Sequence, residues 1–173
     1  AFAVVDEVVA LGALVACYRG DRAAAQAWAE AFAAASPGSA TAPTSAPMLT
    51  GPVAVLPRIA LALASEPLLR QAVDLLQRRL AAAQAIHRTT EIMQCAVLLA
   101  CCGRRLNQPV AALQALEQAL ALGWPHGYRT VFLEHADDLA PLVQTLVQRR
   151  ICPEAAALLA AIAAQQARQR PTP

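Results

Sequence analysis

Residues able to do chemistry are sparse in this chain of 173 residues. The densest group of potential metal ligands is the segment Glu134-His135-Ala136-Asp137-Asp138. A metal site needs three or four ligands that converge at about 2 Å, whereas Asp137 and Asp138 stand where the N-cap of a following helix is expected. We therefore predict that one of these aspartates caps a helix, and we assign no metal ligand.

Catalytic and redox patterns are absent from the sequence as well. No Ser or Cys stands in a nucleophile elbow, and neither His-x-Glu nor His-Glu-x-x-His occurs. The five cysteines have no disulfide-framework or zinc-site spacing, and their apolar neighbours predict reduced, buried thiols. They are Cys17, Cys95, Cys101, Cys102 and Cys152. We predict a protein that is not an enzyme, with no catalytic residue and no cofactor.

The charge balance limits the classes of partner. The net charge is +2, and all 14 basic residues are arginines. A nucleic-acid-binding face needs clustered basic residues, so we expect no direct nucleic-acid binding by this segment. The apolar run Val8 to Tyr18 is shorter than the roughly 20 residues that cross a membrane. With no secretory signal expected, these patterns predict a cytoplasmic protein without a membrane span.

Apolar residues recur at helical spacing along most of the chain, and few stretches alternate as strands do. The sequence therefore predicts an all-α fold without a sheet. The expected helices cover Phe2 to Tyr18, Arg22 to Ala35, Val53 to Ala64, Leu68 to Ile86, Glu91 to Cys102, Pro109 to Leu122, Tyr128 to His135, Leu139 to Arg149 and Pro153 to Arg168.

Several residues are typical of helix ends. Gly20 can take the left-handed conformation that ends a helix, and Asp21 can cap the next helix. Pro67 and Pro109 suit the first turn of a helix. Thr89 or Thr90 is the expected cap of the helix that follows it.

Three of the expected helices share one apolar spacing. Ala72-Val73-x-x-Leu76-x-x-x-Leu80 matches Ala112-Leu113-x-x-Leu116-x-x-x-Leu120 at a shift of 40, and Ala24-Ala25-x-x-Trp28-x-x-x-Phe32 has the same form. A two-helix repeat of roughly 34 to 47 residues is typical of tetratricopeptide and related solenoids. We predict a right-handed superhelix of tetratricopeptide-like helical hairpins with a C-terminal helical cap, and the Trp28/Phe32 pair in its core. An ordinary Ala-rich helical bundle is the alternative.

The expected organisation has five parts. They are a first helical hairpin at 1–35, a Pro/Ser/Thr-rich loop at 36–52, two tetratricopeptide-like hairpins at 53–125, a C-terminal helical cap at 126–168 and a frayed tail at 169–173.

The segment from Ala112 to Ala161 resembles the region before the DNA-binding domain of large ATP-dependent LuxR-family regulators of bacteria, of the maltose-activator type. It begins ALQALEQALALGWPHGYRTVFLEHADDLAPLVQTLVQRR. The likeness is best over residues 53–165 and weaker over 1–35. The positions that carry it are Pro125, Gly127, Tyr128, Arg129, Phe132, Leu133 and Glu134.

The resemblance implies a modular protein with a nucleotide-hydrolysing switch, a helical-repeat sensor and a helix-turn-helix. This chain shows only the sensor, because without lysine the Gly-x-x-x-x-Gly-Lys-Ser/Thr phosphate loop cannot be written. The expected function is binding of a small effector or a protein partner on the concave surface, with ATPase and DNA-binding domains outside this chain. The alternative is a stand-alone tetratricopeptide scaffold that binds a peptide or partner protein. The sequence allows an oligomer in either case.

Five residues are candidates for the ligand or partner surface. The first helix of each hairpin lines the concave side of such a stack, where we expect outward-facing Arg58, Glu91 and Gln94. Tyr128 and Arg129 enter through the resemblance. The structural alternative for them is a buried Tyr128 hydroxyl bonded to a carbonyl, and Arg129 paired with Glu134 or Asp138.

Overall fold

The computed structural model of the chain describes residues 2–35 and 52–169. Within these ranges all regular structure is helical, with nine α-helices, one short 3-10 helix and no strand, which confirms the predicted all-α class. The predicted loop at 36–52 lies outside the described residues except for Pro52, and so do positions 170–173 of the predicted tail. The chain divides into two compact units, Ala1–Ile86 and His87–Pro173, and each is described by itself.

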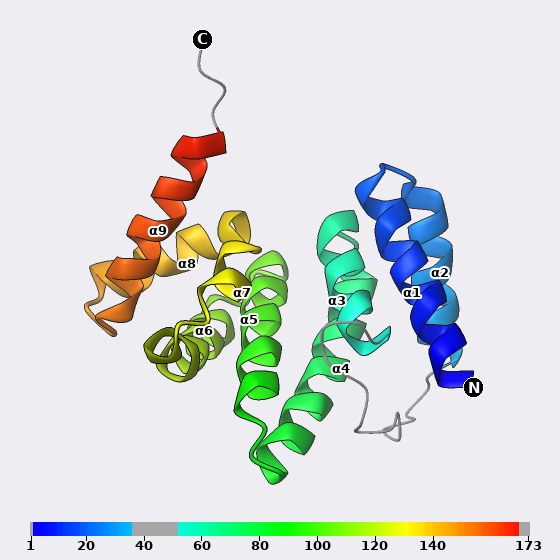
Figure 1. Cartoon of the computed structure of the whole chain (residues 1–173), viewed down its shortest axis with the longest axis horizontal. Helices are drawn as coiled ribbons and strands as arrows, with labels where there is room; N and C mark the ends of the chain where they lie inside the picture. Colours follow the sequence, from blue (N-terminus) through cyan, green and yellow to red (C-terminus); the bar gives the residue numbers. More distant parts are fainter. Residues whose placement is uncertain (1, 36–51, 170–173) are drawn as a thin grey trace. The chain divides into compact units, whose positions relative to one another are not determined.

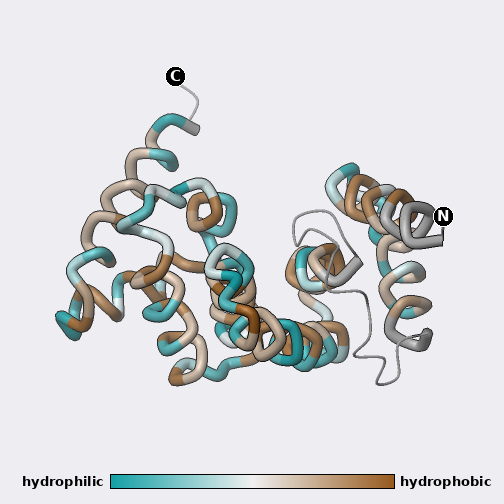
Figure 2. Tube along the Cα trace, turned by 60° about the horizontal axis from the view of Figure 1, so that its bottom comes forward, coloured by the Kyte–Doolittle hydropathy of each residue, from teal (hydrophilic) through white to brown (hydrophobic). Residues whose placement is uncertain are grey.

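Unit 1 contains four helices, and α3 packs against both α1 and α4 (Figure 1). Its core is built from small and branched apolar side chains, and hydrophobic and hydrophilic positions follow one another along the tube (Figure 2). Helix α1 contacts both α2 and α3. The helices are α1 (Phe2–Tyr18), α2 (Arg22–Ala35), α3 (Pro52–Leu63) and α4 (Glu66–Ala85).

The joint between α1 and α2 forms as the sequence predicts. Gly20 has φ of +88°, and the Asp21 amide donates to the Ala16 carbonyl at 2.9 Å, which closes the α1 end with a left-handed residue. Asp21 then caps α2, because its carboxylate accepts a hydrogen bond from the Ala24 amide at 3.0 Å. Next to this cap, the Arg22 guanidinium donates to the Leu63 carbonyl at 3.2 Å and so satisfies the last turn of α3.

Helix α2 departs from the predicted repeat. Ala72 and its counterpart Ala112 are fully buried, whereas Ala24, at the matching position of α2, is exposed. The buried small residues of α2 are Ala25 and Ala29, one and five positions after Ala24. Helix α2 therefore presents a different face to its neighbours. The aromatic pair Trp28 and Phe32 is half-buried and stacked, with ring centroids 5.3 Å apart. The prediction that this pair lies in a core is therefore met only in part.

The outer face of α1 is apolar and exposed. Its side chains there include Val8, Val9, Val15 and Tyr18, the last of them 73 % exposed. No helix in the described part of the chain combines the length and the hydrophobicity that a membrane crossing requires. An exposed apolar stripe of this kind is a common place for association with another protein surface.

Unit 2 is a helical hairpin with further helices packed on it. The hairpin helices α5 (Thr89–Arg105) and α6 (Pro109–Gly123) approach closely at Gly103, where an added Cβ atom would lie 3.2 Å from the Cβ of Ala112. A larger side chain at either position would push the two helices apart. The remaining elements of this unit are the 3-10 helix η1 (Trp124–His126), α7 (Arg129–Leu133), α8 (Ala136–Gln148) and α9 (Glu154–Gln169).

Two predicted caps of unit 2 are wrong. Helix α5 begins at Thr89 with Arg88 at its N-cap, so neither threonine caps it. Helix α8 begins at Ala136 with His135 at its N-cap, so Asp137 and Asp138 lie inside the first turn instead of before it. Carboxylates in a first turn still interact favourably with the helix dipole, which explains why the helix starts here.

Candidate functional site

The residues that carry the family resemblance lie where the chain leaves α6. That helix ends at Gly123, η1 follows, and Gly127 turns the chain with φ of +79°. The Gly127 amide donates to the Trp124 carbonyl at 3.1 Å, and the Tyr128 amide donates to the Gly123 carbonyl at 3.2 Å. Only glycine takes this backbone conformation without strain, so Gly127 fixes the direction in which Tyr128 and Arg129 leave the turn.

Tyr128 is exposed, and the expectation of a buried tyrosine is wrong. Its side chain is 40 % exposed, and its hydroxyl accepts a long hydrogen bond of 3.5 Å from the Thr90 hydroxyl. Thr90 belongs to the first turn of α5, so this bond joins the two ends of the chain segment that forms the hairpin. A partly exposed tyrosine can offer a partner both its apolar ring and its hydroxyl group.

The sequence suggested an ion pair of Arg129 with Glu134 or Asp138, and Asp138 is not the partner of Arg129. Its guanidinium lies over the indole ring of Trp124, 5.3 Å from the ring centroid. Such a cation–π contact contributes about 0.5–1 kcal/mol at an exposed site and restricts where the guanidinium lies. Asp138 is instead occupied by two other arginines, as described below.

A buried aromatic core supports this exposed layer. Phe132 is fully buried and meets Trp124 edge to face, with centroids 6.1 Å apart. Gly123 leaves room for these rings, because an added Cβ atom there would collide with Met93 and come within 3.2 Å of Phe132. We call the exposed layer, residues 87–90 and 124–130, the junction surface.

Three candidates from the predicted concave surface are placed differently. Glu91 and Gln94 are only 7 % and 8 % exposed, so the expectation that they face outward is wrong. The Glu91 carboxylate lies 3.5 Å from the Arg88 guanidinium. Arg58 is half-buried on α3 and belongs to unit 1. Of the five candidates, only Tyr128 and Arg129 are exposed.

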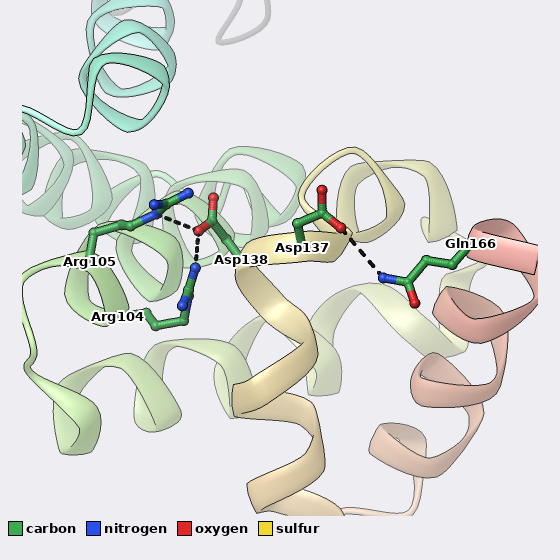
Figure 3. Close-up of polar contacts among 5 residues, drawn as sticks. All are labelled: Arg104, Arg105, Asp137, Asp138 and Gln166. Atoms are coloured by element: carbon green, nitrogen blue, oxygen red, sulfur yellow. Dashed lines mark hydrogen bonds and ion pairs between the residues drawn. The ribbon is translucent and has the colours of Figure 1, made fainter. Parts of the chain in front are cut away.

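A second polar cluster lies at the other end of α5 (Figure 3). One oxygen of the Asp138 carboxylate accepts hydrogen bonds from Arg104 at 2.5 Å and from Arg105 at 2.7 Å, and Asp137 accepts one from Gln166 at 3.4 Å. The Asp138 side chain is 12 % exposed, whereas Arg104 and Arg105 are 30 % and 38 % exposed, so only the carboxylate side of these charge-assisted bonds is withdrawn from water. The cluster ties α8 to α5 and α9, and we assign it a structural role.

The residues that could have served as metal ligands or nucleophiles have structural roles. Within the described ranges no group of three or more His, Cys, Asp and Glu side chains could hold a metal ion. Cys95, Cys101 and Cys102 are buried as predicted, whereas Cys17 and Cys152 are half-buried. Burial, with the nearby Asp138 carboxylate, raises the pKa of the Cys102 thiol to about 12. Such a thiol is mostly protonated at neutral pH and is a poor nucleophile.

The raised pKa of Cys102 predicts a loss of stability at alkaline pH. The unfolded chain releases this proton near the ordinary value of 9.0, but the folded chain holds it to about 12. The stability is therefore fully present below pH 9 and falls as pH rises toward 12, by up to about 1.4 kcal/mol per pH unit for one thiol. In urea unfolding between pH 8 and 11, Cys102→Ala should flatten this fall. If the free energy of unfolding falls equally steeply with pH in the variant and in the parent chain, the assignment of this pH dependence to Cys102 is wrong.

Comparison of the chain with protein-family models, with curated proteins and with solved structures finds no match in any of the three.

Proposed function

We propose that this chain is a non-catalytic binding module of tetratricopeptide-like helical hairpins that acts as the effector-sensing part of a bacterial LuxR-type transcriptional regulator. On this proposal the hairpins form a right-handed superhelix, the elements after residue 125 form its cap, and the protein works in the cytoplasm. ATP hydrolysis and DNA binding belong to domains outside this chain.

One observation carries the proposal: two residues of the family resemblance, Tyr128 and Arg129, are exposed side by side above a buried aromatic ring. Tyr128 and Arg129 stand at the start of α7, above the buried ring of Phe132. Aromatic residues and arginine dominate the binding energy of protein interfaces. Tyr128 and Arg129 are both exposed, so a partner can reach them, and this accessibility supports a role in binding.

A thermal-shift experiment with defined ligand classes tests the binding role. The panel contains neutral oligosaccharides, phosphorylated metabolites and short peptides, each in excess over the protein. A ligand present at 100 times its dissociation constant stabilises the folded chain by about 2.7 kcal/mol, so at least one class should raise the melting temperature. Arg129→Ala should abolish the shift, and Arg149→Ala, an exposed arginine at the end of α8, should preserve it. A flat response to every class would contradict the sensing role.

The complete reading frame separates the regulator from a stand-alone scaffold. A phosphate-loop domain before this segment and a helix-turn-helix after it are expected for the regulator. A reading frame that lacks both the phosphate-loop domain and the helix-turn-helix would contradict the regulator proposal. A positive thermal shift would then still support a stand-alone binding scaffold.

A further inference from the structure

We propose that the partner of the junction surface is an acidic peptide segment, presented by another protein or another domain, which places a carboxylate on Arg129. This inference rests on the proposed binding function and names the class of partner.

The charge of the junction surface is the first argument. Positions 87–90 and 124–130 contain two arginines, Arg88 and Arg129, and two histidines, with no aspartate or glutamate among them. The carboxylate that follows directly, Glu91, is 7 % exposed and faces Arg88. The next exposed carboxylate along the chain is Glu134, four positions after the junction surface ends. Within the junction surface itself the charged groups are cationic, which favours an anionic partner.

The geometry of Arg129 is the second argument. The central carbon of its guanidinium lies over the Trp124 ring, 5.3 Å from the ring centroid. A guanidinium carries its N–H donors in a planar fork that matches the two oxygens of a carboxylate. Because the contact with Trp124 already restricts the side chain, less conformational entropy is lost when a carboxylate binds.

The shape of the surface favours a peptide over a small molecule. Sites for small molecules are concave and bury most of the ligand. Here the contributing side chains are exposed: Tyr128 at 40 %, with Thr90 and Arg129 also exposed. Their polar groups come from two segments joined by the Thr90–Tyr128 hydrogen bond. An extended chain can cross both segments and contact the hydroxyls and the guanidinium in turn.

Selection of random linear peptides against the full chain tests the inference without a known partner. The selected peptides should be enriched in Asp and Glu. Their affinity should fall by about tenfold or more in Arg129→Ala, as expected for a lost charge-assisted contact in an interface. The conservative variant Arg129→Lys should recover only part of that loss, because ammonium cannot pair in the bidentate way. The control Arg149→Ala should bind like the parent chain.

Three results would overturn the acidic-peptide inference. They are selection of neutral or basic peptides, acidic peptides whose affinity ignores Arg129, and tighter binding of an oligothymidylate or inorganic phosphate than of the selected peptides. If the selected peptides are not acidic but still need Arg129, the inference fails and the proposed binding function stands. If the selection and the thermal-shift panel both yield nothing, both proposals fail.

Discussion

Replacing Phe132 with alanine is expected to lower the free energy of unfolding of unit 2 by about 3–5 kcal/mol, the usual cost of removing a buried aromatic side chain. Phe132 is fully buried, and its ring meets the edge of Trp124 at 6.1 Å between centroids. The neighbouring Gly123 has no side chain that could move into the vacated space. The loss should therefore leave a cavity beneath the junction surface.

Denaturant unfolding followed by the fluorescence of Trp124 measures this cost. The chain has two tryptophans, so the experiment uses a Trp28→Phe background in which Trp124 alone reports on unit 2. The neighbouring variant Val131→Ala removes a half-buried side chain of the same helix and should cost far less. If the two variants cost the same, Phe132 is not the support that its burial indicates.

Replacing Asp138 with asparagine is expected to lower the free energy of unfolding of unit 2 by about 2–3 kcal/mol. Its carboxylate receives hydrogen bonds from Arg104 and Arg105, and its own side chain is only 12 % exposed. The variant keeps the size of the side chain but leaves two neighbouring cations without their counter-charge. In the described part of the chain, the buried Nε of Arg104 already has no hydrogen-bond partner, so the site has little capacity to compensate.

Asp137→Asn is the matched control for this variant. Asp137 stands in the same first turn of α8, so both substitutions remove one favourable charge from the helix dipole. Asp137 is exposed, and its hydrogen bond with Gln166 is 3.4 Å long, so we expect a loss of about 0.5 kcal/mol or less. Equal losses in the two variants, measured by denaturant unfolding, would show that the dipole and not the arginine pair explains the effect.

The helical elements were largely predictable because their signals are local. Periodic apolar residues mark the helices, Asp21 caps α2 as expected, and Pro109 begins α6 as expected. The ends of other helices were less predictable. His87 and Arg150 follow helices in the left-handed conformation although they are not glycine, with φ of +54° in both. Local sequence disfavours this conformation, and the packing of the following helix must supply the energy that maintains it.

The candidate site was predictable only in part, because the partners of its side chains are distant in sequence. The two arginines that bind Asp138 precede it by 33 and 34 positions, and no local pattern links them to it. A capping rule therefore assigned that aspartate to its own helix. Glu91 was expected to face outward because polar residues usually do, yet it is buried beside Arg88. The family resemblance alone drew attention to Tyr128 and Arg129.

The most direct test of the proposed binding surface is the response of the two indole N–H resonances in a proton–nitrogen NMR spectrum. The variant Trp28→Phe assigns both signals, since only Trp124 then remains. On addition of a ligand identified in the thermal-shift panel, the Trp124 signal should shift, because its ring carries the Arg129 guanidinium. The Trp28 signal, which belongs to unit 1, should stay in place. A saturating ligand that moves Trp28 and leaves Trp124 unchanged would contradict the assignment of the junction surface as the binding site.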